Sequence, residues 1–284
     1  MVHDIGHDPA GRTLAGQVAV VTGGGRGLGR EVARRLAAEG ARVGVAARSS
    51  DQVQETVRSI EETGGQALGF ATDITDRNAV QNMIGAVESQ FGPTDLLINN
   101  AAVITPIGPA WEVDVEEWWR LFEINVYGAF VCAHAVLPRM ISRGSGRIVN
   151  VASGAGIESP PFGSAYVSSK AALIRLSEAL AIETQDRGVA VFAIDPGWLS
   201  TAMAHHLAYS EQGKRWTPWA ASLFGTEREV PLERGAQLVV TLASGRADGL
   251  TGRFISVRDD VEDLIRRADD IRREDLYSVR LRRE

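Results

Sequence analysis

The chain has 284 residues, of which 44% are hydrophobic and 23% are charged, proportions typical of a soluble globular protein with one large α/β domain or two small ones. Its formal net charge of −6 and its lack of a basic cluster argue against nucleic acid as the main partner. No apolar run reaches the length of a membrane span, and the one cysteine, Cys132, excludes an internal disulfide. We therefore expect a cytoplasmic protein with no nucleic-acid or membrane partner.

Residues 1–15 are polar and contain glycine and proline, so we expect a flexible N-terminal arm there. His3 and His7 lie in this arm, but two histidines in a mobile arm are more often solvated than bound to a metal, and we expect no metal site. The pattern changes from Gln17 onward. Residues 18–22, Val-Ala-Val-Val-Thr, form a short apolar run of the kind that is buried on both faces of a parallel sheet.

A glycine-rich turn follows this first strand and leads into a helical pattern that ends at Gly40. A strand, a glycine turn and a helix N-terminus together form an anion cradle, because backbone N–H groups and the helix dipole can reach a pyrophosphate that no Cβ atom obstructs. The turn therefore predicts a dinucleotide site. Its candidate cofactor-binding residues are Gly23, Gly25, Arg26, Gly27, Leu28 and Gly29.

The end of the second expected strand, residues 41–47, bears on cofactor choice. A dinucleotide fold that reads NAD carries an acid there, on the ribose hydroxyls, whereas this chain has Ala47 and then Arg48. Arg48 and Arg26 could clamp a 2′-phosphate with charge-assisted hydrogen bonds. The pattern favours NADP(H), with NAD(H) the alternative if both arginines are solvated surface residues.

Strand and helix patterns continue to alternate to about residue 195, which predicts a doubly wound parallel sheet, Rossmann-like, in a single α/β domain over residues 16–257. The ligands of such a sheet bind at the carboxyl ends of the strands. Asp73, Asn99, Ser153 and Pro196-Gly197 fall at such ends. The later expected strands are residues 66–71, 95–102, 147–152 and 189–195, and one long helix is expected from about residue 114 to residue 140.

Tyr166 and Lys170 are four residues apart in a stretch with a helical pattern, so they share one face of the helix. A phenol titrates near pH 10, and a fixed cation beside it favours phenolate and moves its pKa toward neutral pH. Of the 30 basic residues only Lys170 and Lys214 are lysines, so a lysine at this position indicates a need for a compact, titratable ammonium. Ser153 could hold a substrate oxygen against the phenol.

These spaced motifs together resemble the classical short-chain dehydrogenases/reductases, and in particular their NADP(H)-preferring branch. Residues 22–29 match the family's Thr-Gly-x-x-x-Gly-x-Gly turn, and residues 99–102 resemble its Asn-Asn-Ala-Gly motif, with Ala102 in place of glycine. The resemblance covers about residues 16–257. It implies a catalytic tetrad of Asn125, Ser153, Tyr166 and Lys170.

The resemblance also implies a role for each tetrad residue. Tyr166 would be the acid/base, Lys170 would lower its pKa and hold the nicotinamide ribose, and Ser153 would orient the substrate oxygen. Asn125 would hold a water that links Lys170 to solvent. Further implied cofactor contacts are Asp73 at the adenine amino group, Ile74, Asn99, Ala101, Pro196, Gly197 and Thr201.

Two segments fall outside these motifs. Residues 198–230 are rich in aromatic residues and lack periodicity, which predicts a loop-like substrate lid and a bulky or aromatic substrate, with core packing of the same rings as the alternative. Residues 258–284 have a helical pattern followed by alternation over residues 276–281, which predicts a helix and a short strand packed on the domain or on a partner subunit. A solvated helix is the alternative.

The leading functional hypothesis is an NAD(P)(H)-dependent oxidoreductase, either a carbonyl reductase or an alcohol dehydrogenase, that acts on a small-molecule ketone or secondary alcohol. A dinucleotide-binding regulatory protein without turnover is one alternative. A related lyase or epimerase that uses the same tyrosine without net redox change is another. Family habit implies a homodimer or homotetramer.

Overall fold

The computed structural model describes residues 11–281. Its centre is a seven-stranded sheet in the order β3-β2-β1-β4-β5-β6-β7, in which every pair of neighbouring strands is parallel. The strand order reverses between β1 and β4, which confirms the predicted doubly wound, Rossmann-like sheet. The strands are β1 (Val18–Thr22), β2 (Arg42–Ala47), β3 (Gln66–Ala71), β4 (Leu96–Asn99), β5 (Gly146–Val151), β6 (Val189–Asp195) and β7 (Phe254–Ser256).

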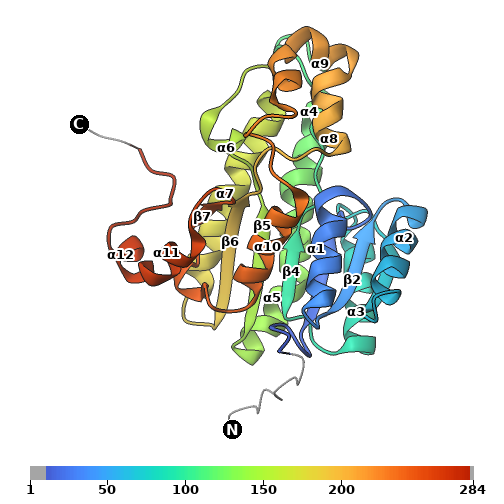
Figure 1. Ribbon diagram of the computed structural model, residues 1–284, viewed down its shortest axis with the longest axis vertical. Coiled ribbons are helices and arrows are strands. Elements are labelled where there is room, and N and C mark those ends of the chain that lie inside the picture. The colour runs from blue at the N-terminus through green and yellow to red at the C-terminus, as the bar shows by residue number, and fades with distance from the viewer. Residues whose placement is uncertain (1–10, 282–284) are drawn as a thin grey trace.

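Helices cover both faces of the sheet (Figure 1). One layer contains α1 (Gly27–Ala38), α2 (Ser50–Glu61) and α10 (Leu232–Ala243), and the other contains α3 (Arg77–Phe91), α5 (Gly128–Arg143) and α7 (Ser164–Thr184). The remaining helical segments are α4 (Val115–Phe122), η1 (Glu123–Tyr127), α6 (Ala155–Glu158), α8 (Ala202–Tyr209), α9 (Glu211–Trp216), η2 (Pro218–Leu223), η3 (Asp248–Leu250), α11 (Val261–Arg266) and α12 (Ala268–Arg273).

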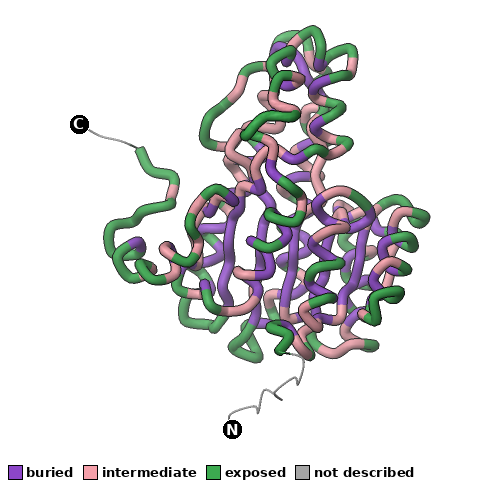
Figure 2. The backbone as a smooth tube through the Cα atoms, in the orientation of Figure 1, coloured by how far each residue is buried: buried purple, intermediate pink, exposed green. Residues whose placement is uncertain are grey.

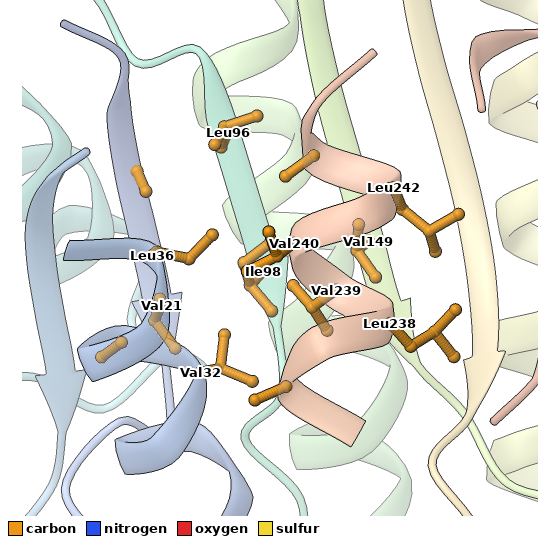
Figure 3. Packing of buried hydrophobic residues seen from close by; sticks show 14 of the residues in the cluster. Val21, Val32, Leu36, Leu96, Ile98, Val149, Leu238, Val239, Val240 and Leu242 are labelled. Carbon is orange, nitrogen blue, oxygen red and sulfur yellow. The ribbon is translucent and has the colours of Figure 1, made fainter. Parts of the chain in front are cut away.

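The two apolar layers explain why the strand sequences are almost continuously hydrophobic. Successive strand side chains point to opposite faces, so Val20 packs toward α3 and α5 while Val21 packs toward α1 and α10. Figure 3 shows Val239 and Val240 of α10 lying over Ile98 of β4. The strands therefore form the buried centre of the molecule, and the helices carry its exposed surface (Figure 2).

The long expected helix is present, but it contains a π-helical turn. α4, η1 and α5 run without a break from Val115 to Arg143, with the π-turn over Glu123–Tyr127. By length and mean hydropathy this helix could cross a membrane, yet 44% of its most apolar window is buried inside the domain. Those buried residues pack against the sheet, as in the core helix of a globular domain.

The first described residues pack on the domain. Leu14 is fully buried, and its N–H donates to the carbonyl of Glu39. The flexible arm was expected to reach residue 15, but residues 13–15 are held on the domain. Residues 1–10, which make up the rest of that arm, lie outside the described part of the chain.

The expected lid is helical and not a loop. Residues 198–230 contain α8, α9 and η2, which lie above the carboxyl ends of the strands (Figure 1). Thr201 caps α8 and Ser210 caps α9, and each side chain accepts a hydrogen bond from a backbone N–H. In the sequence these capping residues could not be distinguished from ordinary loop residues. Ring contacts within the lid join Trp198 to Trp219 and His205 to Phe224.

The appendage after β7 is only partly as expected. Leu264 of α11 and Ile271 of α12 are buried against the domain, but the strand predicted over residues 276–281 is wrong. Asp275 has φ +52° and Tyr277 has φ +57°, and these left-handed residues prevent an extended ladder. One backbone bond, from the Phe254 N–H to the Tyr277 carbonyl, joins the segment to β7.

Candidate active site

A cavity of about 1370 Å³ lies at the carboxyl ends of the strands and is bounded on one side by the lid. Most of the candidate site residues lie at this cavity. Those that line the cavity are Gly23, Gly25, Arg26, Gly27, Leu28, Gly29, Arg48, Asp73, Ile74, Ala101, Ser153, Tyr166, Lys170, Pro196, Gly197 and Thr201. Asn99 and Asn125 do not line it.

The glycine turn after β1 is held by side chains from three other segments. Gly23 and Gly27 have φ of +64° and +55°, a backbone conformation that residues with a side chain rarely adopt. A Cβ at Gly29 would lie 2.3 Å from the Gly23 carbonyl oxygen. Three successive carbonyls accept bonds from side chains: Gly23 from Asn100 (3.2 Å), Gly24 from Thr56 (3.0 Å) and Gly25 from Arg30 (2.6 Å). The carbonyls of the turn are thus occupied, and the first N–H groups of α1, which have no partner within the helix, remain for an anion.

Asn99 has a structural role that was not expected. Its side chain is buried, and its Nδ2 donates to the Ala129 carbonyl (3.2 Å) and to Asn150 Oδ1 (2.9 Å), so it joins β4 to β5 and α5. The next residue, Asn100, lines the cavity and holds the glycine turn. The side chains of a strand alternate in direction, and the side chain of the first asparagine of the motif points into the core, so a contact between Asn99 and the cofactor remains a prediction.

Arg26 and Arg48 lie at the same end of the cavity. Arg26 is the N-cap residue of α1, Arg48 follows β2, and both side chains are exposed. Neither forms an ion pair with any residue in the range 11–281, so two guanidinium groups line this end of the cavity without a counter-charge. Such a pair can bind a phosphate through charge-assisted hydrogen bonds.

Asp73 also lines this end, where its carboxylate is fixed by neighbours. Its Oδ1 accepts from the Thr75 N–H and hydroxyl, and its Oδ2 pairs with Arg120 at 3.1 Å. Burial raises the pKa of this carboxyl, but the bonds from Thr75 and the charge of Arg120 outweigh burial and leave the pKa below its usual value. Asp73 is therefore an ionised acceptor in a fixed orientation.

Tyr166 and Lys170 meet at the other end of the cavity, on α7. Lys170 Nζ lies 5.5 Å from the centroid of the Tyr166 ring and donates to the Val151 carbonyl at 2.7 Å. Burial lowers the pKa of Lys170 to about 8. The ammonium is thus held between the end of β5 and the phenol.

The pKa of Tyr166 differs from the expectation. Burial, the largest cause, and the negative charge of Asp195 raise it, the hydrogen bond with the Ser153 hydroxyl lowers it by less, and the resulting pKa is about 12. Lys170 does not bring this pKa below its ordinary value, because removing the phenolate from water is the larger effect. Tyr166 is accordingly a protonated phenol at neutral pH, with Ser153 beside it.

Asn125 lies in the π-turn between α4 and α5 and is buried. Its Nδ2 donates to the Val103 carbonyl (2.9 Å) and to the Ser169 hydroxyl (3.1 Å), and its Oδ1 accepts the Val103 N–H (2.9 Å). Both amide hydrogens are used in joining the segment after β4 to α7. The amide thus positions two walls of the cavity, and the water-holding role implied by the resemblance remains a prediction.

Several lining residues escaped the sequence analysis. Asp195 ends β6 next to the Pro-Gly pair, Arg228 lies near the end of the lid, and Arg258 follows β7. The rule that ligands bind at strand ends could have identified Asp195, which is the last residue of a strand. Arg228 and Arg258 had no such signal. No cluster of three or more metal-ligating residues occurs in the part of the chain that the structure describes.

Comparison with known proteins agrees with this site. A family model described as short chain dehydrogenase matches residues 17–212. A short chain dehydrogenase of Pseudocercospora fijiensis is 39% identical over 186 residues, which are 65% of this chain and 60% of that protein. This chain therefore belongs to the short-chain dehydrogenase/reductase family, although it spans less than two thirds of that relative's length.

Two solved structures have the same fold. An actinorhodin polyketide ketoreductase with NADPH shares 33% identity and a TM-score of 0.77, with 85% of this chain and 95% of that chain covered. A xylitol dehydrogenase bound to NAD+ shares 29% identity and a TM-score of 0.78, with coverage of 86% and 98%. The family and the cavity together define an oxidoreductase with a nicotinamide dinucleotide site.

Proposed function

We propose that this protein is an NADP(H)-dependent oxidoreductase that interconverts a bulky, mainly apolar ketone and its secondary alcohol, with Tyr166 as the acid/base. One observation carries the proposal. Tyr166, Ser153 and Lys170 lie together in the wall of a cavity whose other end holds the glycine turn and two unpaired arginines. A proton donor and a dinucleotide cradle thus belong to one site.

The residues at the cradle end fit a phosphorylated dinucleotide. The N-terminus of α1 would bind the pyrophosphate, Arg26 and Arg48 would bind a 2′-phosphate, and Asp73 would accept the adenine amino group. A bound nicotinamide supplies or accepts the hydride. The two similar solved structures hold NADPH in one case and NAD+ in the other, so the proposed preference rests on Arg26 and Arg48.

The residues at the reaction end handle the proton. Tyr166 is protonated at neutral pH because its pKa is about 12, so it can donate to the oxygen of a carbonyl as that oxygen gains charge. The Ser153 hydroxyl can donate to the same oxygen and orient it. Lys170 keeps a positive charge below its pKa of about 8, which stabilises the phenolate that remains after the transfer.

The lid side of the cavity sets the substrate class. The side chains there are mainly apolar and large, which suits a bulky aromatic or aliphatic carbonyl compound. They are Trp198, Leu199, Met203, Leu207, Trp219 and Leu223.

A surface feature supports the predicted homo-oligomer. Trp119, Tyr127, Phe130 and Ile141 are exposed along the outside of the continuous helix from α4 to α5. Exposed apolar side chains that gather along one helix mark a protein contact more often than a solvated face.

The Tyr166→Phe variant tests the proposal. We expect turnover of ketones in an NADPH absorbance assay to fall by about 10²- to 10⁴-fold, since the general acid is lost, while NADPH binding followed by fluorescence stays within about twofold. An equally active variant would exclude Tyr166 as the acid/base. A wild type that turns over no ketone or alcohol would favour the regulatory alternative, and product formed without net NADPH consumption would favour the lyase or epimerase.

A further inference from the structure

Asp195 is a cavity-lining carboxylate whose charge acts on the proton donor. It ends β6 and lines the cavity, and its Oδ2 lies 3.4 Å from the position that a Cβ on Gly154 would take. Gly154 follows Ser153 directly, so the Asp195 carboxylate lies against the residue after the serine that is proposed to hold the substrate oxygen. Its charge is also felt at Tyr166, whose pKa it raises.

The bonds that Asp195 makes within the protein do not use its full capacity. Oδ1 accepts the Gly197 N–H at 3.1 Å and Oδ2 accepts the Ser256 hydroxyl at 3.2 Å. A carboxylate offers about four acceptor sites. Acceptor capacity therefore remains on a group that borders the cavity.

No cation within residues 11–281 pairs with Asp195. Lys170 donates to the Val151 carbonyl, and Arg258, which lines the same cavity, donates to the Arg228 carbonyl at 2.8 Å. The neighbouring Asp259 accepts the Ser256 N–H and so adds a second carboxylate behind the first. This part of the wall thus offers hydrogen-bond acceptors, and a purely apolar substrate would leave the spare acceptor capacity of Asp195 without a partner.

We propose that Asp195 is a specificity-determining residue that accepts a hydrogen bond from a hydroxyl or ammonium group on the carbon next to the substrate carbonyl. The inference rests on the proposed function and narrows its substrate class to vicinal hydroxy ketones and amino ketones and the matching diols and amino alcohols. Ser153 and Tyr166 hold the carbonyl oxygen, and the donor on the adjacent carbon reaches Asp195 beyond Gly154. The apolar lid then covers the rest of the substrate.

A purely structural role is the competing explanation, because Asp195 also joins the Pro196-Gly197 turn to β7 through Ser256. Two variants separate the roles. Asp195→Asn keeps an acceptor for the Gly197 N–H but replaces the charged oxygen with an amide. Ser256→Ala is the matched control, since it removes the bond to β7 and leaves the carboxylate in place.

The experiment compares kcat/KM with NADPH for four ketones. They are acetophenone, 2-hydroxy-1-phenylethanone, 2-amino-1-phenylethanone and phenylglyoxylate, and the second and third carry the hydroxyl or amine on the carbon next to the carbonyl. We expect the wild type to favour the hydroxy or amino ketone over acetophenone by at least about 10-fold, as for a hydrogen bond to a charged group. Asp195→Asn should reduce this preference to within about threefold of unity, and Ser256→Ala should retain it. Acetophenone turnover itself should change little in Ser256→Ala, which leaves the Asp195 carboxylate in place.

Three results would overturn the inference while leaving the proposed function intact: no wild-type preference for the donor-bearing ketones, a preference for phenylglyoxylate, or an equal loss of preference in Asp195→Asn and Ser256→Ala. The first two need only the wild type, so they decide the matter even if a variant fails to fold. Failure of the wild type to reduce any of the four ketones would instead count against the proposed function, and the inference would fall with it.

Discussion

The two ends of the cavity are built in different ways. At the cradle end the ligand-facing groups are backbone N–H groups. The carbonyls of Gly23, Gly24 and Gly25 each accept a hydrogen bond from a side chain that lies outside the turn. At the reaction end the working groups are the side chains of Tyr166 and Lys170, whose pKa values burial moves in opposite directions. The cradle therefore depends on the absence of Cβ atoms, and the reaction end depends on buried charge.

The largest effect should come from adding one Cβ at the cradle. In Gly29→Ala the new atom would lie 2.3 Å from the Gly23 carbonyl oxygen and 2.4 Å from Asn100 Nδ2, so the turn must move. We expect NADPH binding to weaken by about 100-fold or more, since overpacking costs about 1–3 kcal/mol or more. Fluorescence titration measures the effect. Gly85→Ala, in an open position on α3, is the control and should bind NADPH as the wild type does.

The buried charge at the reaction end should be visible in the pH dependence of kcat/KM. Lys170 has a lowered pKa of about 8, so its cation is present below that pH and is lost above it, whereas Tyr166 stays protonated up to about 12. We expect kcat/KM for ketone reduction to be flat below pH 8 and to fall by up to about tenfold per pH unit above it.

Lys170→Met is the matched variant for that profile, because it keeps the length of the side chain and removes the charge. It should lower the plateau by about 10²-fold and abolish the decline near pH 8. A decline that persists in Lys170→Met would assign it to another group.

Charge at the cradle end should have a smaller effect, because Arg48 is exposed. We expect Arg48→Asp to weaken NADPH binding by about tenfold and to leave NADH binding nearly unchanged or improved, since a charge-assisted bond to the 2′-phosphate is lost and an acid takes its place. Arg58→Asp on α2, another exposed arginine that does not line the cavity, is the control. Equal affinity of the wild type for NADPH and NADH would show that Arg26 and Arg48 are ordinary surface residues.

The contrast between the two ends also explains what the sequence could predict. The cradle was predictable because its requirements are local: a buried strand, glycines at fixed spacing and a helix start follow one another along the chain. The doubly wound parallel sheet followed from the same repetition of strand and helix. Tyr166 and Lys170 were predictable as neighbours because four residues along a helix return to one face.

What could not be predicted depends on contacts between distant segments. The pKa of Tyr166 depends on how deeply the phenol is buried and on Asp195, which is 29 positions away in the chain. The contribution of Asn100 to the glycine turn was missed because only the packed structure shows which of two adjacent side chains, Asn99 or Asn100, points inward. The prediction of a strand over residues 276–281 was wrong because the backbone at Tyr277 is left-handed. A glycine would have indicated such a conformation in the sequence, but this position holds a tyrosine.

The smallest effect should come from the lid, whose aromatic side chains pack partly on one another. Trp219 lines the cavity, is 38% exposed and contacts Trp198 with ring centroids 6.3 Å apart. Trp219→Ala should raise KM for apolar ketones by about 3- to 10-fold through the loss of contact area and leave the NADPH affinity unchanged. Tyr209→Ala is the control, because this exposed ring packs on Phe224 and does not line the cavity. If both variants raise KM equally, the lid affects substrate binding through its own folding and not through direct contact between Trp219 and the substrate. The lid would then differ from the reaction end, where side chains act directly.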